Sequence, residues 1–475
     1  MQDVTETTPP APAPDRGPGE PLVFRDERGE LNPLYVGNVA AAIAAGDAES
    51  LRELLGDEHE ADLGDLLEAL AQDERPRLIE LLGADFDFAA LTEVDDAVRE
   101  EILEELKTST VAEGVRDLDS DDAIRILESL DEAEKAEVLD QLPALERVAL
   151  QRSLDYPEES AGRRMQTQFI AVPPFWTVGQ TIDFMRETDD LPETFYEIFV
   201  IDPAGHLLGA VALDRLLRTK RPVTIGEIMD DEPDRVLATQ HQEEVARLFE
   251  RYNLVSAAVV DQSNRLVGAM MVDDIVDVLE EEADADIKAL GGVNSEEELS
   301  DTVFYTQRSR FPWLFVNMCT ALAAASVIRL FEGAIQHMVA LAILMPVVAS
   351  MGGNAGTQTM TVAVRALATR ELGRGNAWRI IRREAMVGVL NGLAFAVIMG
   401  CLAGLWFNTA DLGIVIGLAL VTVLVFAALG GIFVPLTLNR LGIDPAVSSG
   451  PFVTSITDIV GFFSFLGIAA FWFGI

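Results

Sequence analysis

The sequence predicts a multidomain protein: an all-α superhelical N-domain, an α+β tandem repeat, an acidic connecting helix and a five-helix α transmembrane domain. Three observations predict this layout. Residues 308–475 are mostly apolar, residues 160–280 carry a pattern repeated at an offset of 59 residues, and most acidic residues precede position 308. Of 35 Lys+Arg and 78 Asp+Glu, residues 308–475 hold only 10 and 6. So acidic a soluble part repels nucleic acid and attracts divalent cations.

Residues 1–34 are expected to form a disordered leader rather than a signal peptide. Met1–Glu20 contains five prolines and no apolar core, a composition that favours neither folding nor export. The soluble part is therefore expected in the cytoplasm. The two cysteines, Cys319 and Cys401, lie in apolar runs, and the four histidines are scattered, so neither a disulfide framework nor a zinc site is expected.

Residues 35–158 are expected to form an acidic domain of short helices, because their apolar residues recur every three to four positions. Most of the acids then lie on the solvated faces of these helices. A superhelix of helical repeats fits the loose periodicity. The clearest predicted helices are Ala61–Ala71, Arg75–Leu82, Ala97–Leu106, Asp121–Leu130 and Glu132–Leu142.

Residues 159–272 contain the repeat. Val200–Asp202 and Leu207–Ala210 recur as Val259–Asp261 and Leu266–Ala269, and each copy reads as strand, turn, strand and helix. A further helix is predicted before each copy, at residues 178–187 and 242–252.

This repeat resembles a tandem CBS pair, a module that often senses ligands and sometimes binds adenine nucleotides. The resemblance implies ATP as a candidate partner, with Asp214 and Asp274 as its candidate ligands. Such pairs commonly carry Ser or Thr shortly after the glycine, where this chain has Ala212 and Met271. The first copy also has Arg215 where an Asp is usual. These departures leave nucleotide binding open.

Residues 273–307 are expected to form an acidic connecting helix and a linker. Asp273, Asp277, Glu280 and Asp284 recur every three to four residues on one predicted helical face. Like charges at this spacing repel each other by a few tenths of a kcal/mol per pair. The face is either simply solvated or binds counter-cations, and its position directly before the membrane domain favours a regulatory role.

Residues 308–475 contain five apolar runs, each long enough for a transmembrane helix of about 20 residues. Arg residues cluster before the first run, between the second and third, and between the fourth and fifth. The positive-inside rule therefore places the N-terminus in the cytoplasm and the C-terminus outside. The predicted spans are Pro312–Phe331, Gln336–Ala363, Ala385–Phe407, Leu412–Leu438 and Ala446–Gly474.

Asp458 lies about midway along the fifth span, beside Thr454. A carboxylate at mid-bilayer costs at least ~2.5–3.5 kcal/mol on insertion scales, so it should face a water-filled path or a partner. The alternative is a protonated Asp bonded to a neighbouring helix. The second span carries Pro346, Gly353, Asn354 and Gln358, whose freed carbonyl and side-chain oxygens suit a polar path. In the same span, Gly352 and Gly356 form a small-xxx-small face suited to close helix packing.

These parts, in this order, resemble the MgtE family of magnesium channels or transporters over about residues 35–475. The motifs that carry the resemblance are Glu159–Met165 at the start of the CBS pair, Pro346 with Gly352–Gln358, Arg365–Arg370, and Asp444–Ala446 with Gly450, Pro451 and Asp458.

The resemblance implies a homodimer with its pore between the membrane domains, where the two copies of Asp458 hold a hydrated Mg²⁺. Gly353, Asn354, Gln358 and Thr454 are the further candidate pore residues. Mg²⁺ loses water reluctantly and is usually held by one or two carboxylates with several waters, which agrees with so sparse a site.

The resemblance also implies that cytoplasmic Mg²⁺ binds between the acidic faces of the connecting ("plug") helix, the CBS pair and the N-domain, and so closes the pore. The family's plug-helix ligands correspond to Asp274, Asp277, Glu282 and Asp286. A further family acid falls at Ala285, and Asp121 and Asp122 are the N-domain candidates. Two alternatives stay open: a carrier for Mn²⁺, Co²⁺ or Ca²⁺, and a non-conducting membrane sensor. An enzyme is not expected, since no phosphate-binding loop or nucleophile–base set is present.

Overall fold

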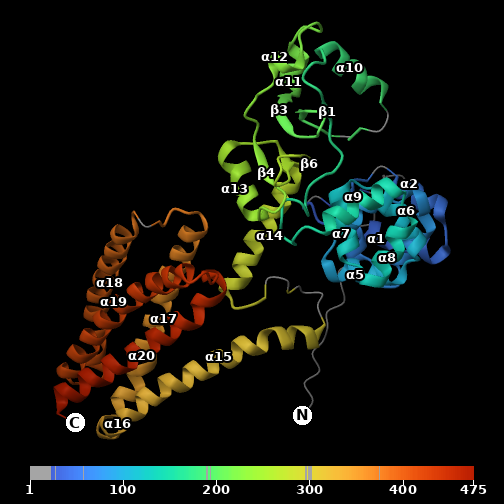
Figure 1. Cartoon of the computed structure of the whole chain (residues 1–475). Coiled ribbons are helices and arrows are strands. Elements are labelled where there is room, and N and C mark those ends of the chain that lie inside the picture. The colour runs from blue at the N-terminus through green and yellow to red at the C-terminus, as the bar shows by residue number, and fades with distance from the viewer. Residues whose placement is uncertain are drawn as a thin grey trace. The chain divides into compact units, whose positions relative to one another are not determined.

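The computed structural model describes residues 23–26, 28–56, 58–188, 191–192, 194–294, 297, 302–373 and 375–474 (Figure 1). The chain divides into two compact units, one on each side of the boundary between Val278 and Leu279. The first unit holds a helical domain and two small β-sheets, and the second holds the long apolar helices.

The predicted disordered leader, residues 1–34, extends too far along the chain, because residues from Phe24 onward pack against the N-domain. Residues 1–22 lie outside the described residues, but Phe24 is buried and its ring packs edge-on against Tyr35, with centroids 4.9 Å apart. Arg25 forms ion pairs with Asp62 and Asp65. An aromatic side chain and a bidentate cation thus attach this segment to the N-domain, and the first helix, α1, begins at Pro33 behind an Asn32 cap.

The N-domain is a stack of short helices around one apolar core, whose fully buried members include Ile43, Leu66 and Ile124. The predicted helices all form, with ends that shift by one or two residues. The helices are α1 (Pro33–Ala45), α2 (Ala48–Leu55), α3 (Glu60–Ala69), α4 (Arg75–Leu82), α5 (Asp96–Glu105), α6 (Thr108–Asp117), α7 (Ser120–Glu128), α8 (Glu132–Gln141) and α9 (Ala144–Leu154), with short 3₁₀ turns at Gly83–Asp85 and Phe88–Leu91.

The repeat folds into two three-stranded sheets with the same topology. In each, a short strand pairs parallel with the second strand, which pairs antiparallel with the third. The registers match at the 59-residue offset: Glu197 faces Ala212, and Ser256 faces Met271. The strands are β1 (Ala171–Val172), β2 (Glu197–Ile201), β3 (Leu207–Ala212), β4 (Arg235–Leu237), β5 (Ser256–Val260) and β6 (Leu266–Met271); the helices are α10 (Val178–Glu187), α11 (Leu213–Arg218), α12 (Ile225–Ile228) and α13 (Gln242–Tyr252).

The two copies are joined by equivalent hydrogen bonds. The Leu207 N–H donates to Asn264 O at 3.0 Å, and the Leu266 N–H donates to Gly205 O at 3.0 Å. Each bond is related to the other by the 59-residue offset, so the pair has an approximate twofold axis between the turns. Gly205 and Asn264 occupy the turn position with positive φ, 84° and 61°, which Gly and Asn tolerate best.

The two units are connected by α14 (Val272–Leu290). Five helices of the second unit are long and apolar enough to cross a membrane. Pro312 lies inside the first of them rather than at its start, because the helix extends back to Val303 behind a Thr302 cap. The helices are α15 (Val303–Leu330), α16 (Glu332–His337), α17 (Val339–Ala368), α18 (Ala377–Trp406), α19 (Ala410–Arg440) and α20 (Pro445–Phe473).

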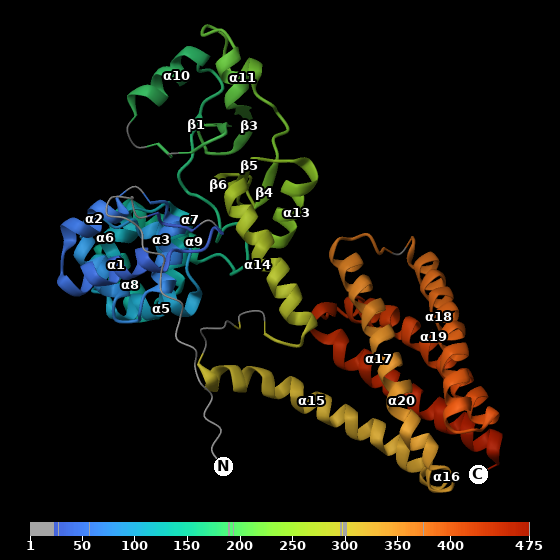
Figure 2. The same cartoon turned by 180° about the vertical axis from the view of Figure 1, so that it is seen from behind.

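Within this unit, α19 contacts α17, α18 and α20, and Figures 1 and 2 show α18 and α19 side by side. Glycines allow the closest approaches. A Cβ on Gly431 of α19 would lie 2.7 Å from Gly356 O of α17, and one on Gly352 of α17 would lie 2.6 Å from Val423 Cγ1 of α19. This confirms that the small-xxx-small face of α17 is a packing face.

Candidate functional site

Asp458 is half-buried on α20 and has no cationic partner among the described residues. Its neighbour Thr457 is buried and packs toward α17, where a Cβ on Gly356 would lie 3.1 Å from Thr457 Cγ2. The Thr457 hydroxyl donates to Thr454 O at 2.9 Å. Tight glycine packing therefore fixes the rotation of α20, and with it the position of the Asp458 carboxylate.

The polar residues of α17 lie on a different face from its packing glycines. Asn354 and Gln358 are one helical turn apart and both exposed, and a Cβ on Gly353 would meet nothing within 4 Å. These three predicted pore residues are therefore accessible. The described residues contain no group of three His, Cys, Asp or Glu side chains that could hold a metal.

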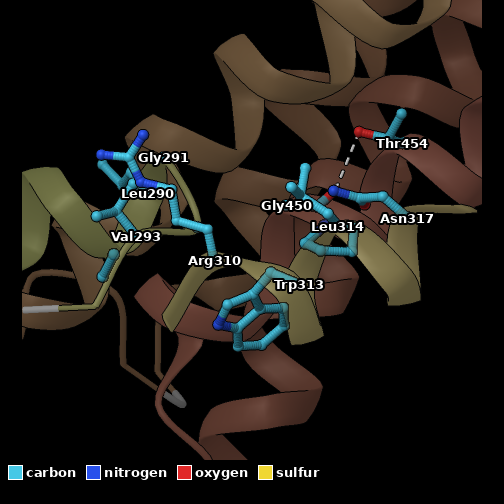
Figure 3. A pocket seen from close by; sticks show the side chains of 12 residues that line it. Leu290, Gly291, Val293, Arg310, Trp313, Leu314, Asn317, Gly450 and Thr454 are labelled. Carbon is cyan, nitrogen blue, oxygen red and sulfur yellow. Dashed lines mark hydrogen bonds between the residues drawn. The ribbon is translucent and has the colours of Figure 1, made fainter. Parts of the chain in front are cut away.

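Thr454, the remaining predicted pore residue, lines a pocket of about 240 Å³ beside the start of α20. Figure 3 shows this pocket with Arg310, Trp313 and Asn317 of α15 along one wall. The Thr454 hydroxyl donates to Gly450 O at 3.0 Å, which leaves the oxygen lone pairs available as acceptors. Because Thr454 lies one turn before Asp458, the two positions are ~6 Å apart along the helix axis.

The first unit contains a second acidic site, between α7 and α14. The carboxyl groups of Asp121 and Asp274 are in hydrogen-bond contact, and burial together with the charge of Asp121 raises the pKa of Asp274 well above its usual range. Asp121 Oδ1 is buried without a hydrogen-bond partner among the described residues. Two carboxyl groups held this close need a shared proton or a cation between them.

Asp122 and Asp277 flank this contact. Burial and the neighbouring Asp121 raise the pKa of Asp122 to about 8, while Asp277 pairs with Arg125 at 3.6 Å. Four predicted regulatory residues, two from each element, therefore lie at or beside this contact, although no three of them form a group that could hold a metal ion. Glu282 is half-buried and Asp286 exposed, two and three turns further along α14.

Two residues that the sequence analysis did not single out support the Asp121–Asp274 contact. Gln166 Nε2 donates to Asp121 Oδ2 at 3.5 Å, and the Thr167 N–H donates to Ser120 Oγ at 2.7 Å. Both residues directly follow the Glu159–Met165 motif, and this position in the sequence is the signal that could have identified them. The two predicted nucleotide ligands do not lie together in one site. Asp274 contacts Asp121, and Asp214 is exposed in the first turn of α11.

Comparison with known proteins gives consistent results along the chain. The family model for MgtE, a divalent cation transporter, matches residues 345–468; the MgtE intracellular N domain matches residues 58–159; and a CBS domain matches residues 225–281. The magnesium transporter MgtE of Thermus thermophilus is 33% identical over 449 residues, 90% of this chain and 96% of the relative. The chain belongs to the MgtE family.

The chain is similar to other MgtE proteins as well. That of Bacillus subtilis is 30% identical over 424 residues, 89% of this chain and 94% of its own. A solved structure of the cytosolic domain of the Mg²⁺ channel MgtE in complex with ATP is 30% identical and covers 51% of this chain and 99% of its own, with a TM-score of 0.48. These matches confirm the predicted family and the predicted multidomain layout. They also confirm the prediction that the protein is a multi-pass membrane transporter and not an enzyme.

Proposed function

We propose that this MgtE protein imports Mg²⁺ down the membrane potential through a pore that contains Asp458. The observation that carries the proposal is the half-buried carboxylate of Asp458 within a span, which has no cationic partner among the described residues, together with the exposed amides Asn354 and Gln358 on α17. Its relatives are named magnesium transporters. A divalent ion gains about 4.6 kcal/mol per 100 mV of inside-negative potential, so import needs no other energy source.

A second copy of the chain completes the pore. One Asp458 is too few for a metal site, whereas two, with amide and backbone oxygens from Gly353, Asn354 and Gln358, suit a Mg²⁺ that keeps several waters. The exposed positions of Asn354 and Gln358 leave them free to face this partner. The Arg-rich loops orient each copy with its N-terminus in the cytoplasm and its C-terminus outside.

The CBS pair supplies a further reason to expect a homodimer. Tyr196 and Val255 are 38% and 49% exposed, and Leu217 and Val276 are 66% and 55% exposed. Each of these two pairs is related by the 59-residue offset, so the approximate twofold of the CBS pair repeats its exposed apolar positions. Exposed apolar side chains that a twofold repeats suit an isologous interface with a second copy.

Gating belongs to the Asp121–Asp274 contact. Magnesium prefers carboxylate oxygens, and the buried, unpartnered Asp121 Oδ1 is a ready ligand. Cytoplasmic Mg²⁺ bound there would offset the repulsion between α7 and α14 and hold the acidic faces together, which favours the closed pore. When Mg²⁺ falls, repulsion separates the faces and the pore opens.

The test is Mg²⁺ uptake into proteoliposomes with an imposed inside-negative potential. We expect uptake by the wild type, loss of uptake in Asp458→Asn, and faster uptake at high cytoplasmic-side Mg²⁺ in Asp274→Asn. Potential-driven uptake that survives in Asp458→Asn would refute the pore assignment. Uptake of Mn²⁺, Co²⁺ or Ca²⁺ in preference to Mg²⁺ would identify a carrier for another ion, and no uptake at any Mg²⁺ concentration would identify a sensor.

A further inference from the structure

The pocket beside the start of α20 is lined by a positively charged side chain. Arg310 of α15 lines it together with Trp313, Asn317, Thr454 and Leu290 (Figure 3). If the proposed function holds, a cation that leaves Asp458 toward the start of α20 passes this pocket, because Thr454 lies one turn away on the same face of the helix. A lone guanidinium at this place would repel that cation.

The structure shows how this charge is offset. Arg310 donates from both Nε and Nη2 to a single oxygen of Glu297, with Nε 2.6 Å from Oε1. Glu297 is only 5% exposed, whereas the Arg310 side chain is 53% exposed. Burying a carboxylate costs desolvation free energy, which a paired cation offsets. The pair thus places a buried negative charge directly behind the exposed positive one.

We propose that Glu297 sets the charge of this pocket: by neutralising Arg310, it removes an electrostatic barrier from the path of the divalent cation. The proposal rests on the proposed function but adds a residue to it. Glu297 acts through Arg310 and touches no cation itself, so it is a positioning residue. It lies in none of the acidic clusters described above.

The expected size of the effect follows from Coulomb's law. A unit charge about 10 Å from a divalent cation in water changes the local concentration of that cation about fourfold. The effect should be largest at low ionic strength and should shrink toward 1 M salt, where the screening length falls to about 3 Å.

The experiment compares initial Mg²⁺ uptake by proteoliposomes of wild type, Glu297→Gln, Arg310→Gln and the double variant. We expect Glu297→Gln to lower uptake about fourfold at low salt, and the double variant to recover the wild-type rate. Arg308→Gln is the matched control, since Arg308 is exposed on the same helix but is not among the residues that line the pocket. Unchanged uptake in Glu297→Gln, or a double variant as slow as Glu297→Gln, would overturn the proposal.

A second measurement separates charge from folding. In a Cys319→Ser, Cys401→Ser background, Asn317→Cys is modified after folding with a cationic or an anionic thiol reagent of similar size. We expect the cationic adduct to slow uptake more than the anionic one, whereas equal slowing would contradict a role for charge. Uptake by Asp458→Asn is measured in parallel. If the wild type and Asp458→Asn take up Mg²⁺ equally, the proposed function is overturned together with this inference. If uptake depends on Asp458 but the charge of the adduct has no effect, only this inference is overturned.

Discussion

The carboxyl group of Asp274, at the start of α14, is in hydrogen-bond contact with that of Asp121 on α7. Two acids that are far apart in the sequence therefore meet. The arrangement costs free energy unless a proton or a cation is shared. This gives the acidic N-domain a physical reason to change its stability with the concentration of divalent cations.

The first prediction concerns Mg²⁺ and the stability of the soluble unit. Magnesium should raise the melting temperature of the purified protein, because an ion that binds only the folded state at 100 times its Kd contributes about 2.7 kcal/mol. Asp121→Asn and Asp274→Asn should each remove most of this shift in a thermal melt followed by circular dichroism. Glu280→Gln is the control, because it neutralises an exposed acid on the same helix. This variant should keep the Mg²⁺-dependent rise in melting temperature.

The second prediction concerns pH. The pKa of Asp122 is raised to about 8 by burial and by Asp121, so the folded protein binds this proton more tightly than the unfolded chain. The resulting stability is fully present below the unfolded pKa near 4 and is lost as pH rises through about 8. In Mg²⁺-free buffer the melting temperature should fall between pH 5 and pH 9, and Asp122→Asn should flatten that fall. An equally steep fall in Asp122→Asn would contradict the assignment.

The third prediction concerns the packing of α17 against α19. A Cβ on Gly431 would lie 2.7 Å from Gly356 O and 2.8 Å from Thr359 Cβ, and neither can move without its helix. Overpacking of this kind typically costs 1–3 kcal/mol, so Gly431→Ala should unfold at lower temperature in detergent. The adjacent Gly430 is the matched control, because its nearest neighbour to a new Cβ is 3.7 Å away. Equal melting temperatures for the two variants would show that this contact is loose.

Local structure could be predicted from the sequence wherever a repeat or a period was present. The predicted helices at Arg75–Leu82, Val178–Glu187 and Gln242–Tyr252 match α4, α10 and α13. The 59-residue repeat likewise predicted two equivalent sheets, and the strand registers confirm it. The prediction that the first span begins at Pro312 was wrong. Proline only prefers the start of a helix, and transmembrane helices also tolerate it in their interior.

Contacts between distant elements could not be predicted from spacing. The meeting of Asp121 with Asp274 was expected only from the family resemblance, because no local period links α7 to α14. The ion pair between Glu297 and Arg310 was not predicted at all, since Glu297 belongs to the predicted linker and Arg310 to the Arg residues just before the first predicted span. Asp458 was found from its cost in a membrane, but the residues that face it depend on how the helices, and a second copy, pack.

The last prediction concerns the exposed apolar positions of the CBS pair. Leu217→Asp and Val276→Asp each place a charge where a second copy is proposed to pack, and a charge buried in an interface without a partner is strongly unfavourable. The double variant should therefore shift the full-length protein in detergent from dimer toward monomer, measured by sedimentation velocity. Phe175→Asp is the control, because Phe175 is 72% exposed but its counterpart at the 59-residue offset is Asp234, not an apolar residue. A double variant that stays as dimeric as the control would exclude this face and leave the membrane domain to hold the two copies together.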